Sequence, residues 1–250
     1  MAQSGVMRIW NTSTPAVRVI ALINVMLFAL PTLIDMLGFS FAGVTVSDLL
    51  LIWGAKNNIA IAAGDQYYRF ITMMFLHAGL LHLLFNTMAL VSIGTDIEQL
   101  CGTQRFLGIY LVGGFAGGVA SYVYTANPAV GASGAIFALI GAELIYILRN
   151  RRLYGDQTKQ LLANVGFTAL LNIGIGFTVP NIDNMAHIGG LCGGFICGLL
   201  LTPRVVPVLY ADGSVVPAKQ TLSWGWYGVI AVIVGLVGVV MSVVPAMDLG

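Results

Sequence analysis

Residues 127–141 read NPAVGASGAIFALIG, and this stretch decides how the rest of the sequence is interpreted. After its first turn it has the apolar composition of a helix that lies in lipid. Its beginning differs, because Gly131, Ala132, Ser133 and Gly134 place one hydroxyl among small residues. Small residues at a helix start also serve close helix packing, so packing alone is the first alternative to a chemical role.

The composition of the whole chain is that of a membrane protein. Of its 250 residues, 58% are hydrophobic and 8% are charged. The mean hydropathy of +0.91 lies far above that of ordinary soluble domains. A membrane-spanning helix needs about 20 mostly apolar residues, and this requirement is met by seven segments: 16–37, 79–97, 105–125, 132–148, 160–179, 184–202 and 225–245. The sequence therefore predicts an all-α polytopic membrane protein.

The expected organisation is a membrane core with short connections and no soluble domain. Residues 1–15 would form a short cytoplasmic tail, and the core would extend over 16–202, with its first span retained rather than cleaved as a signal peptide. A long outer loop over 38–78 is rich in apolar and aromatic residues. Three prolines and a turn within 203–224 predict a cytoplasmic hairpin or linker. The seventh span and an outer C-terminus would occupy 225–250.

The distribution of Lys and Arg predicts the orientation in the membrane. With the N-terminus inside, Lys56 and Arg69 of the outer loop face outward. The cytoplasmic side then receives the other nine basic residues: Arg8, Arg18, Arg105, Arg149, Arg151, Arg152, Lys159, Arg204 and Lys219. This bias follows the positive-inside rule and suits a bacterial plasma membrane, with an archaeal or organellar membrane as the alternative. No basic stripe suggests nucleic acid as a partner.

Polar side chains inside spans are costly, so a functional interpretation starts from them. His82 and Asn86 are four residues apart in the second span and project from one helical face. His187 stands near the outer end of the sixth span, and Ser133 precedes the fourth. Because these three spans all run inward, His82, His187 and Ser133 can meet below the outer surface. The simpler alternatives are histidines that pack and an asparagine that links two helices.

These residue types fit serine hydrolase chemistry. A serine hydroxyl becomes a nucleophile when a neutral imidazole within hydrogen-bond reach takes its proton. The backbone N–H of Ser133 at a helix N-terminus, the Asn86 amide and the His82 imidazole can then hold the oxyanion. Glycines on both sides of the serine let backbone and substrate approach closely. Hydrolysis requires water, so a water-accessible cavity is expected at this depth.

Small residues indicate how the fourth and sixth spans approach each other. Gly190 and Gly194 follow His187 at intervals of three and seven residues and therefore share its face. On the fourth span, Phe137 shares the face of Ser133. Close packing of the two faces would bring the hydroxyl of Ser133 to the imidazole of His187, with the ring of Phe137 against that imidazole.

These motifs and their order resemble those of the rhomboid family of intramembrane serine proteases. The resemblance lies in HAGLLHLLFN (77–86), GASGAIF (131–137) and DNMAHIGGLCGG (183–194), on the second, fourth and sixth spans. It implies a rhomboid-like six-helix core followed by one additional C-terminal transmembrane helix. It also implies an active site that opens to the outer side of the membrane.

The resemblance assigns roles residue by residue. Ser133 would be the nucleophile and His187 the general base. His82 and Asn86, together with the backbone amide of Ser133, would form the oxyanion hole. The active-site loop and the packing around it would be shaped by small or aromatic residues: Gly131, Ala132, Gly134, Phe137, Gly190 and Gly194.

Further motif positions are structural by the same resemblance. The family often has Trp-Arg in the first outer loop, and here the pair is Tyr68 and Arg69, a departure at the aromatic position. His77 opens the motif of the second span. Glu98 and Gly102 match an ExxxG element after that span and are interpreted as a structural cap.

The implied substrate is a single-pass membrane protein that is cut in or next to its transmembrane segment, within the lipid bilayer. It would enter laterally between spans two and five, under a cap formed by the loop 178–183. The resemblance implies no metal or organic cofactor, and the sequence contains no zinc-type ligand spacing. Two other interpretations stay open: a catalytically inactive rhomboid-fold protein that binds membrane clients, and a transporter or channel lined by the histidines and Asn86.

Overall fold

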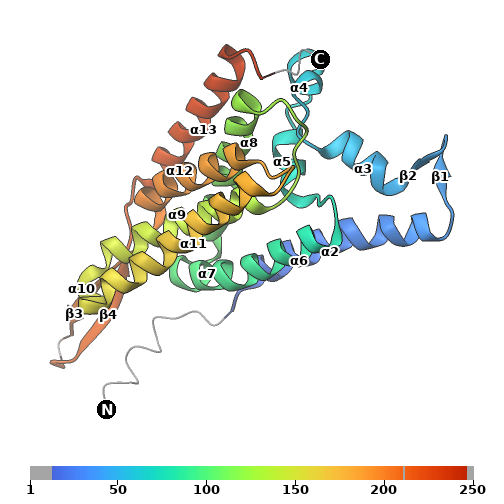
Figure 1. Ribbon diagram of the computed structural model, residues 1–250. Helices are drawn as coiled ribbons and strands as arrows, with labels where there is room; N and C mark the ends of the chain where they lie inside the picture. Colours follow the sequence, from blue (N-terminus) through green and yellow to red (C-terminus); the bar gives the residue numbers. More distant parts are fainter. Residues whose placement is uncertain (1–12, 211, 247–250) are drawn as a thin grey trace.

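The computed structural model describes residues 13–210 and 212–246, which form a bundle of long helices (Figure 1). Most of the expected N-terminal tail with Arg8, the turn residue Ala211 and the last part of the expected outer C-terminus, 247–250, lie outside the described residues. The principal helices are α2 (Pro15–Met36), α8 (Thr103–Tyr124), α9 (Ser133–Arg149), α11 (Thr158–Thr178), α12 (Asn184–Leu201) and α13 (Gly225–Ser242).

The second span is composite. It consists of α6 (Leu80–Ala89), the π-helical segment η3 (Leu90–Gly94) and α7 (Thr95–Cys101). The helix thus continues four residues beyond the predicted end at 97. The reason is that the charged side chain of Glu98, which interrupts the apolar pattern, is fully buried and hydrogen-bonded inside the protein.

Six helical stretches in the described part of the chain are long and apolar enough to cross a membrane. The expected span outside this set is the fourth, α9, which has 17 residues, or about 25 Å of helix. Its residues 134–142 are all buried, because α9 lies in the middle of the bundle and faces other helices instead of lipid. The prediction of an all-α polytopic membrane protein is confirmed.

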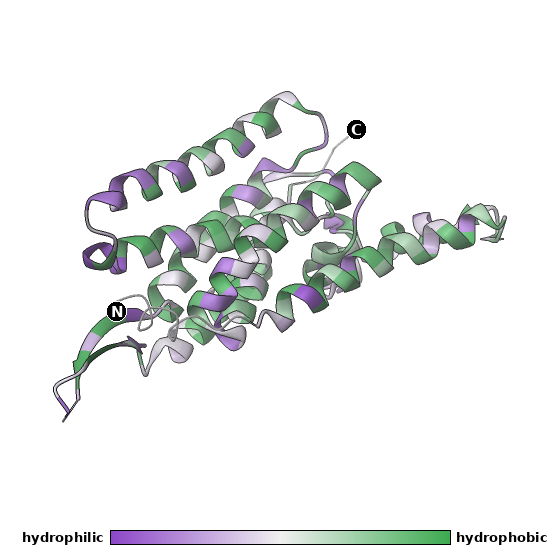
Figure 2. Ribbon diagram, turned by 90° about the horizontal axis from the view of Figure 1, so that it is seen from below, coloured by the Kyte–Doolittle hydropathy of each residue, from purple (hydrophilic) through white to green (hydrophobic). Residues whose placement is uncertain are grey.

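The outer surface of the bundle is apolar, as a lipid-facing surface must be. Large hydrophobic side chains are widely exposed along the outer helices, and Figure 2 shows hydrophobic residues over most of their length. In water such a surface would promote aggregation, whereas in lipid it meets a matching solvent. The chain is therefore an integral membrane protein.

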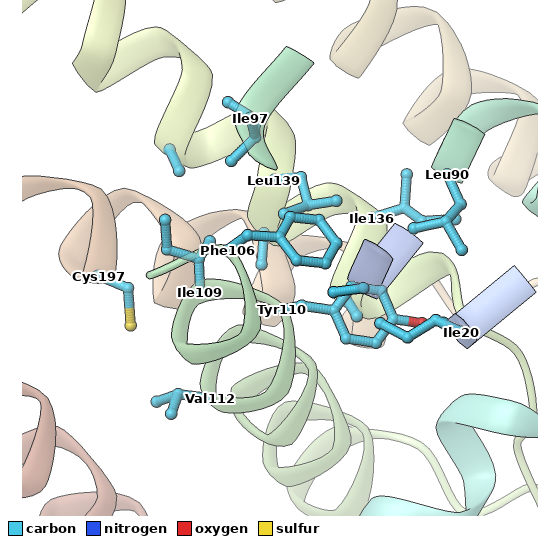
Figure 3. Packing of buried hydrophobic residues seen from close by; sticks show 14 of the residues in the cluster. Ile20, Leu90, Ile97, Phe106, Ile109, Tyr110, Val112, Ile136, Leu139 and Cys197 are labelled. Carbon is cyan, nitrogen blue, oxygen red and sulfur yellow. The ribbon is translucent and has the colours of Figure 1, made fainter. Parts of the chain in front are cut away.

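The centre of the bundle is formed by α8, α9 and α12. A Cβ added at Gly194 of α12 would lie 2.0 Å from the Ala138 carbonyl oxygen of α9, and one at Gly117 of α8 would lie 2.6 Å from the Ala186 carbonyl oxygen of α12. Backbones approach this closely only where side chains are missing. The adjoining apolar cluster is shown in Figure 3 and includes Ile20, Leu90, Ile97, Phe106, Ile109, Tyr110, Ile136 and Leu139.

The expected outer loop 38–78 is largely folded. It contains the hairpin β1 (Ser40–Phe41) and β2 (Val44–Thr45), the helices α3 (Val46–Gly54), α4 (Asn58–Gly64) and α5 (Arg69–Thr72), and the 3₁₀ turn η2 (Met73–Phe75). In Figure 1, the far end of α2 projects sideways from the bundle, and β1, β2 and α3 lie alongside it and lead the chain back toward the bundle.

The opposite end of the bundle carries the remaining connections. They are α10 (Arg151–Tyr154), η4 (Gly155–Gln157) and an antiparallel hairpin of β3 (Arg204–Leu209) and β4 (Val215–Gln220). The hairpin lies within the expected hairpin or linker 203–224. Arg149 donates to the carbonyl oxygen of Leu199, and Lys219 donates to that of Gln99, so these basic residues gather at the end of the bundle that bears the hairpin.

Candidate active site

The site begins at the first residue of α9. Ser133 directly follows Ala132, the residue at the N-cap position. The first N–H groups of a helix have no acceptor within it, and the helix dipole makes this end positive. The Oγ of Ser133 lies 2.9 Å from Nε2 of His187. A hydroxyl, a ring nitrogen and a helix N-terminus therefore meet at one point.

His187 is held in the first turn of α12. The residue is 7% exposed, and its ring stacks on the ring of Phe137, with centroids 4.4 Å apart and planes 15° from parallel. Within the described residues, Nδ1 of this imidazole has no hydrogen-bond partner. Orientation of the imidazole therefore depends on Phe137, on Ser133 and on the placement of α12 itself.

The loop before Ser133 is shaped by Gly131. Its φ of +130° is open to glycine but not to ordinary residues. A Cβ at this position would also lie 2.6 Å from Nε2 of His82 and 3.6 Å from Nδ2 of Asn86. The side chains of His82 and Asn86 thus reach the loop that precedes the serine.

The amide of Asn86 is a free donor at this place. The residue is buried, and its Nδ2 has no acceptor among the described residues. An unsatisfied buried donor is costly, so one beside a candidate nucleophile has the property expected of an oxyanion site. On the other side, a Cβ at Gly134 would contact the carbonyl oxygen of Ala186 at 3.3 Å, which sets the close approach of α9 to the first turn of α12.

His77 lies behind this group. Its ring meets the ring of His82 edge to face, with centroids 5.2 Å apart. Burial, and then the neighbouring His82, lower the pKa of His77 to about 4. The imidazole of His77 is therefore neutral near pH 7 and acts as an uncharged packing partner of His82.

Tyr68 and Arg69 lie in the outer loop. Arg69 is buried and donates from Nη1 to the carbonyl oxygens of Ile52 at 2.9 Å and Ala55 at 2.7 Å. The hydroxyl of Tyr68 donates to the carbonyl oxygen of Trp53 at 3.1 Å while its ring stays largely exposed. The pair ties α5 to the end of α3.

Glu98 and Gly102 lie at the other end of the second span. The carboxylate of Glu98 accepts the N–H groups of Ala16 and Val17 at 3.0 and 2.9 Å. It thereby satisfies the first turn of α2 and places a negative charge at a positive helix end. Gly102 turns the chain between α7 and α8 with a φ of +84°. Neither residue belongs to the group around Ser133.

Two cavities are lined by segments that directly precede Ser133 and His187 in the sequence. One, of about 430 Å³, is lined by Thr125 and residues 176–185. The other, of about 410 Å³, is lined by outer-loop residues, by Ala78 and by residues 128–130. In the sequence, their linings end two residues before His187 and three residues before Ser133.

Sequence reasoning named Asp183 and Lys56 but missed the hydrogen bonds that each makes to the end of α8. Asp183 caps α12 by accepting the N–H of Ala186 at 3.0 Å. The signal was available, because Asp directly before an apolar helical run is a typical N-cap. Lys56 carried a weaker signal, a single Lys within an apolar outer loop, and its contacts come from distant parts of the chain.

Fold and site together define an integral membrane protein whose central helices bring one serine hydroxyl and one imidazole into hydrogen-bond contact. Comparison with known proteins gives the family. A family model described as the Rhomboid domain matches residues 64–204, more than half of the chain. The chain belongs to the rhomboid family.

Three relatives illustrate the relationship. Rhomboid protease GluP of Bacillus subtilis (strain 168) is 45% identical over 159 residues, which are 64% of this chain and 31% of that protein. RHOMBOID-like protein 7 of Arabidopsis thaliana is 43% identical over 60% of this chain and 46% of its own length. RHOMBOID-like protein 6, mitochondrial, of the same plant is 39% identical over 59% and 48%. The chain thus spans less than half the length of each of these relatives.

Proposed function

We propose that this protein is an intramembrane serine endopeptidase in which Ser133 and His187 act as a catalytic dyad. The observation that carries the proposal is the 2.9 Å contact between Ser133 Oγ and His187 Nε2 across α9 and α12. Support also comes from the chain's membership of the rhomboid family and from its similarity to a relative named as a protease.

In the proposed reaction, Nε2 of His187 takes the proton of the Ser133 hydroxyl as Oγ attacks a peptide carbonyl. The negative oxygen that forms is held by Nδ2 of Asn86, a ring N–H of His82 and the backbone N–H of Ser133. Such a donor typically contributes about 10²–10³-fold to the rate. His187 then protonates the leaving amine, and water hydrolyses the acyl-enzyme.

The dyad needs no third side chain in this proposal. Among the described residues, Nδ1 of His187 has no hydrogen-bond partner, so no carboxylate of that part of the chain orients the ring through this atom. Stacking on Phe137 restricts the ring plane instead. A buried carboxylate at this depth would be costly in the absence of a cationic state to pair with it, which gives a physical reason for a two-residue arrangement.

The proposed substrate is a single-pass membrane protein. Every amide of a transmembrane helix is already hydrogen-bonded, so a substrate must unwind before its carbonyl can be attacked. The proposed route of entry is lateral, between α6 and α11. Of the 21 residues of α11, Ala169 and Gly176 are buried, so this helix makes fewer close contacts than α9 or α12 and can move at lower cost.

The entry route can be tested separately from catalysis. Cysteine pairs that crosslink α6 to α11 are expected to stop cleavage of a membrane-embedded substrate. Labelling of Ser133 by a small fluorophosphonate should continue in the crosslinked protein. Unchanged cleavage in the crosslinked protein would exclude entry between these two helices.

The proposed orientation has the N-terminus in the cytoplasm, the C-terminus outside and the site open to the outer side of a bacterial plasma membrane. It is supported by the basic residues at the hairpin end of the bundle, among them Arg149 and Lys219. The outer loop with Lys56 and Arg69 lies on the side of Ser133. Accessibility of single cysteines to an impermeant thiol reagent in intact cells tests this orientation.

The principal experiment is cleavage of a model single-pass substrate by the purified protein in liposomes. Ser133→Ala and His187→Ala should each abolish cleavage and fluorophosphonate labelling. Ser214→Ala, in the exposed tip of the β3–β4 hairpin, serves as a matched control and should leave both unchanged. Absence of cleavage and labelling in the wild type would favour the client-binding alternative, and cleavage by Ser133→Ala would exclude Ser133 as the nucleophile.

A further inference from the structure

A buried polar cluster lies next to the proposed dyad and takes no part in its chemistry. It consists of Lys56 and Asn58 of the outer loop, Ser121 and Thr125 at the end of α8, and Asp183 before α12. The Lys56 side chain is fully buried, with 0% of its surface exposed. A buried charge is costly unless it is paired and hydrogen-bonded, so its contacts require an explanation.

The side chain of Lys56 caps the C-terminal end of α8. Its Nζ donates to the carbonyl oxygens of Thr125 at 2.7 Å and Ser121 at 3.5 Å. The last carbonyls of a helix lack donors within the helix, and this end carries the negative pole of the dipole. Nδ2 of Asn58 adds hydrogen bonds to the carbonyl oxygens of Tyr122 and Thr125, both at 3.1 Å.

The backbone of Lys56 is hydrogen-bonded to the loop that precedes Ser133. Its N–H donates to the carbonyl oxygen of Ala129 at 2.9 Å, and its own carbonyl oxygen accepts the Ala129 N–H at 3.1 Å. Ala129 lies four residues before Ser133. A further bond, from the N–H of Gly131 to the carbonyl oxygen of Met73 at 2.9 Å, fixes the loop that follows.

Asp183 holds the helix that carries the imidazole. Besides capping α12 at the N–H of Ala186, its carboxylate accepts the hydroxyls of Thr125 at 3.2 Å and of Ser121. Ser121 and Thr125 therefore connect the two charges, since their carbonyls accept from Lys56 and their hydroxyls donate to Asp183. Asp183 stands four residues before His187, and its carbonyl oxygen accepts the His187 backbone N–H at 3.2 Å.

We propose that Lys56 is a positioning residue that joins the two halves of the dyad. Its backbone holds the loop before Ser133, and its side chain, through the end of α8, holds the first turn of the helix with His187. This inference rests on the proposed function of the dyad. Such a role for Lys56 also explains how the imidazole of His187 is oriented, although its Nδ1 has no partner in the described chain.

The charge of Lys56 provides a readout beyond folding. Burial lowers the pKa of Lys56 to about 8, and the negative charge of Asp183, which faces it from the start of α12, acts in the opposite direction. The ammonium is thus lost as the pH rises above about 8. Arg at this position would stay charged throughout that range.

The test is the rate of fluorophosphonate labelling of Ser133 in detergent-solubilised full-length protein, which requires no client. Lys56→Met is expected to slow labelling at least ten-fold at pH 7, while Lys56→Arg restores at least a third of the wild-type rate. Lys219→Met is the matched control, because Lys219 also donates to a helix carbonyl, that of Gln99, at the far end of the bundle. It should label at the wild-type rate.

The pH profile and a second variant separate positioning from folding. Wild-type labelling should fall as the pH rises through about 8, and Lys56→Arg should extend the active range upward. Asp183→Asn is expected to slow labelling like Lys56→Met, and the double variant to be no slower than the slower single variant, since both act through one junction. If Lys56→Met does not fold, Lys56→Arg and Asp183→Asn carry the same test.

The outcomes distinguish the inference from the function beneath it. Unlabelled wild-type protein would contradict the proposed dyad. Labelled wild type together with folded Lys56→Met or Asp183→Asn protein that labels at the wild-type rate would overturn the role of Lys56 and leave the dyad intact. Melting temperatures of all variants, measured in the same detergent, identify those that are folded.

Discussion

The centre and the rim of the bundle differ in how closely their helices approach. In the centre, α9 and α12 are in backbone contact, because Gly194 leaves space that a Cβ would fill at 2.0 Å from the Ala138 carbonyl oxygen. At the rim, Gly166 and Gly174 of α11 face open space. Helices in lipid gain little from burying apolar surface, so close packing determines which of them are held rigidly. The proposed dyad lies on the rigid pair, and the proposed entry route lies beside the loosely packed helix.

The largest expected effect is a loss of catalytic rate on removal of the Asn86 amide, which is buried next to the centre of the bundle. Asn86→Ala removes a proposed oxyanion donor and should lower kcat by about 10²–10³-fold with little change in melting temperature. Asn172→Ala on α11 is the matched control at the rim, because this exposed amide donates to the Thr168 carbonyl oxygen of its own helix. Cleavage assays in liposomes measure both. A loss of less than five-fold in Asn86→Ala would remove Asn86 from the oxyanion hole.

The next effect tests the packing itself. Gly194→Ala places a methyl group against the backbone of α9 and should destabilise the protein by about 1–3 kcal/mol or more. Reversible unfolding in mixed micelles measures the free energy. The displaced α12 should also slow fluorophosphonate labelling, since it carries His187. Unchanged stability would show that α9 and α12 do not depend on this close contact.

A smaller effect is expected at the boundary between centre and outer loop. Lys56 has a folded-state pKa of about 8 against an ordinary value of 10.5. Between these pH values the unfolded chain binds more protons than the folded one, so the free energy of unfolding should rise with pH. The measurement compares the melting temperatures of wild type and Lys56→Arg from pH 7 to 10.5. With rising pH, the melting temperature of the wild type should increase relative to that of the variant. Parallel curves would mean that Lys56 is not held as a buried charge.

The smallest effect is expected at the rim and has the opposite sign to that at the centre. Gly174→Ala meets no atom within 4 Å and lies in a helix, where Ala is favoured over Gly by about 0.5–1 kcal/mol. The variant should therefore be slightly more stable than the wild type in the same unfolding assay. A stiffer α11 should also reduce cleavage of an embedded substrate more than it reduces labelling of Ser133. A destabilised Gly174→Ala protein would place α11 with the closely packed helices.

Most of the fold was predictable from local pattern. The expected start of the fourth span at 132 and its observed start at Ser133 differ by one residue, because the small residues before the apolar run mark a helix start. The second span was predicted too short, since Glu98 has the appearance of an end in sequence. Its carboxylate instead binds two N–H groups of α2, more than 80 residues away, and no local signal reports that contact.

The sequence nominated the residues of the candidate site but gave no sign of the contacts that hold them in place. Ser133, His187, His82 and Asn86 could be singled out because polar groups within apolar spans are rare and costly. Their order along spans that are expected to run inward then predicts a similar depth for them. Lys56 did not stand out in this way, since a charged residue in a loop between spans needs no special explanation.

The sequence by itself determined that this protein lies in a membrane, which segments form its long helices and which polar groups those helices carry. These features follow from the length and hydropathy of single segments. Only the tertiary structure decided that Ser133 Oγ lies 2.9 Å from His187 Nε2 and that Lys56 is bonded both to the loop before the serine and to the end of α8. Those contacts join residues 54 to 73 positions apart, and their geometry depends on how glycine faces pack, which no single segment contains.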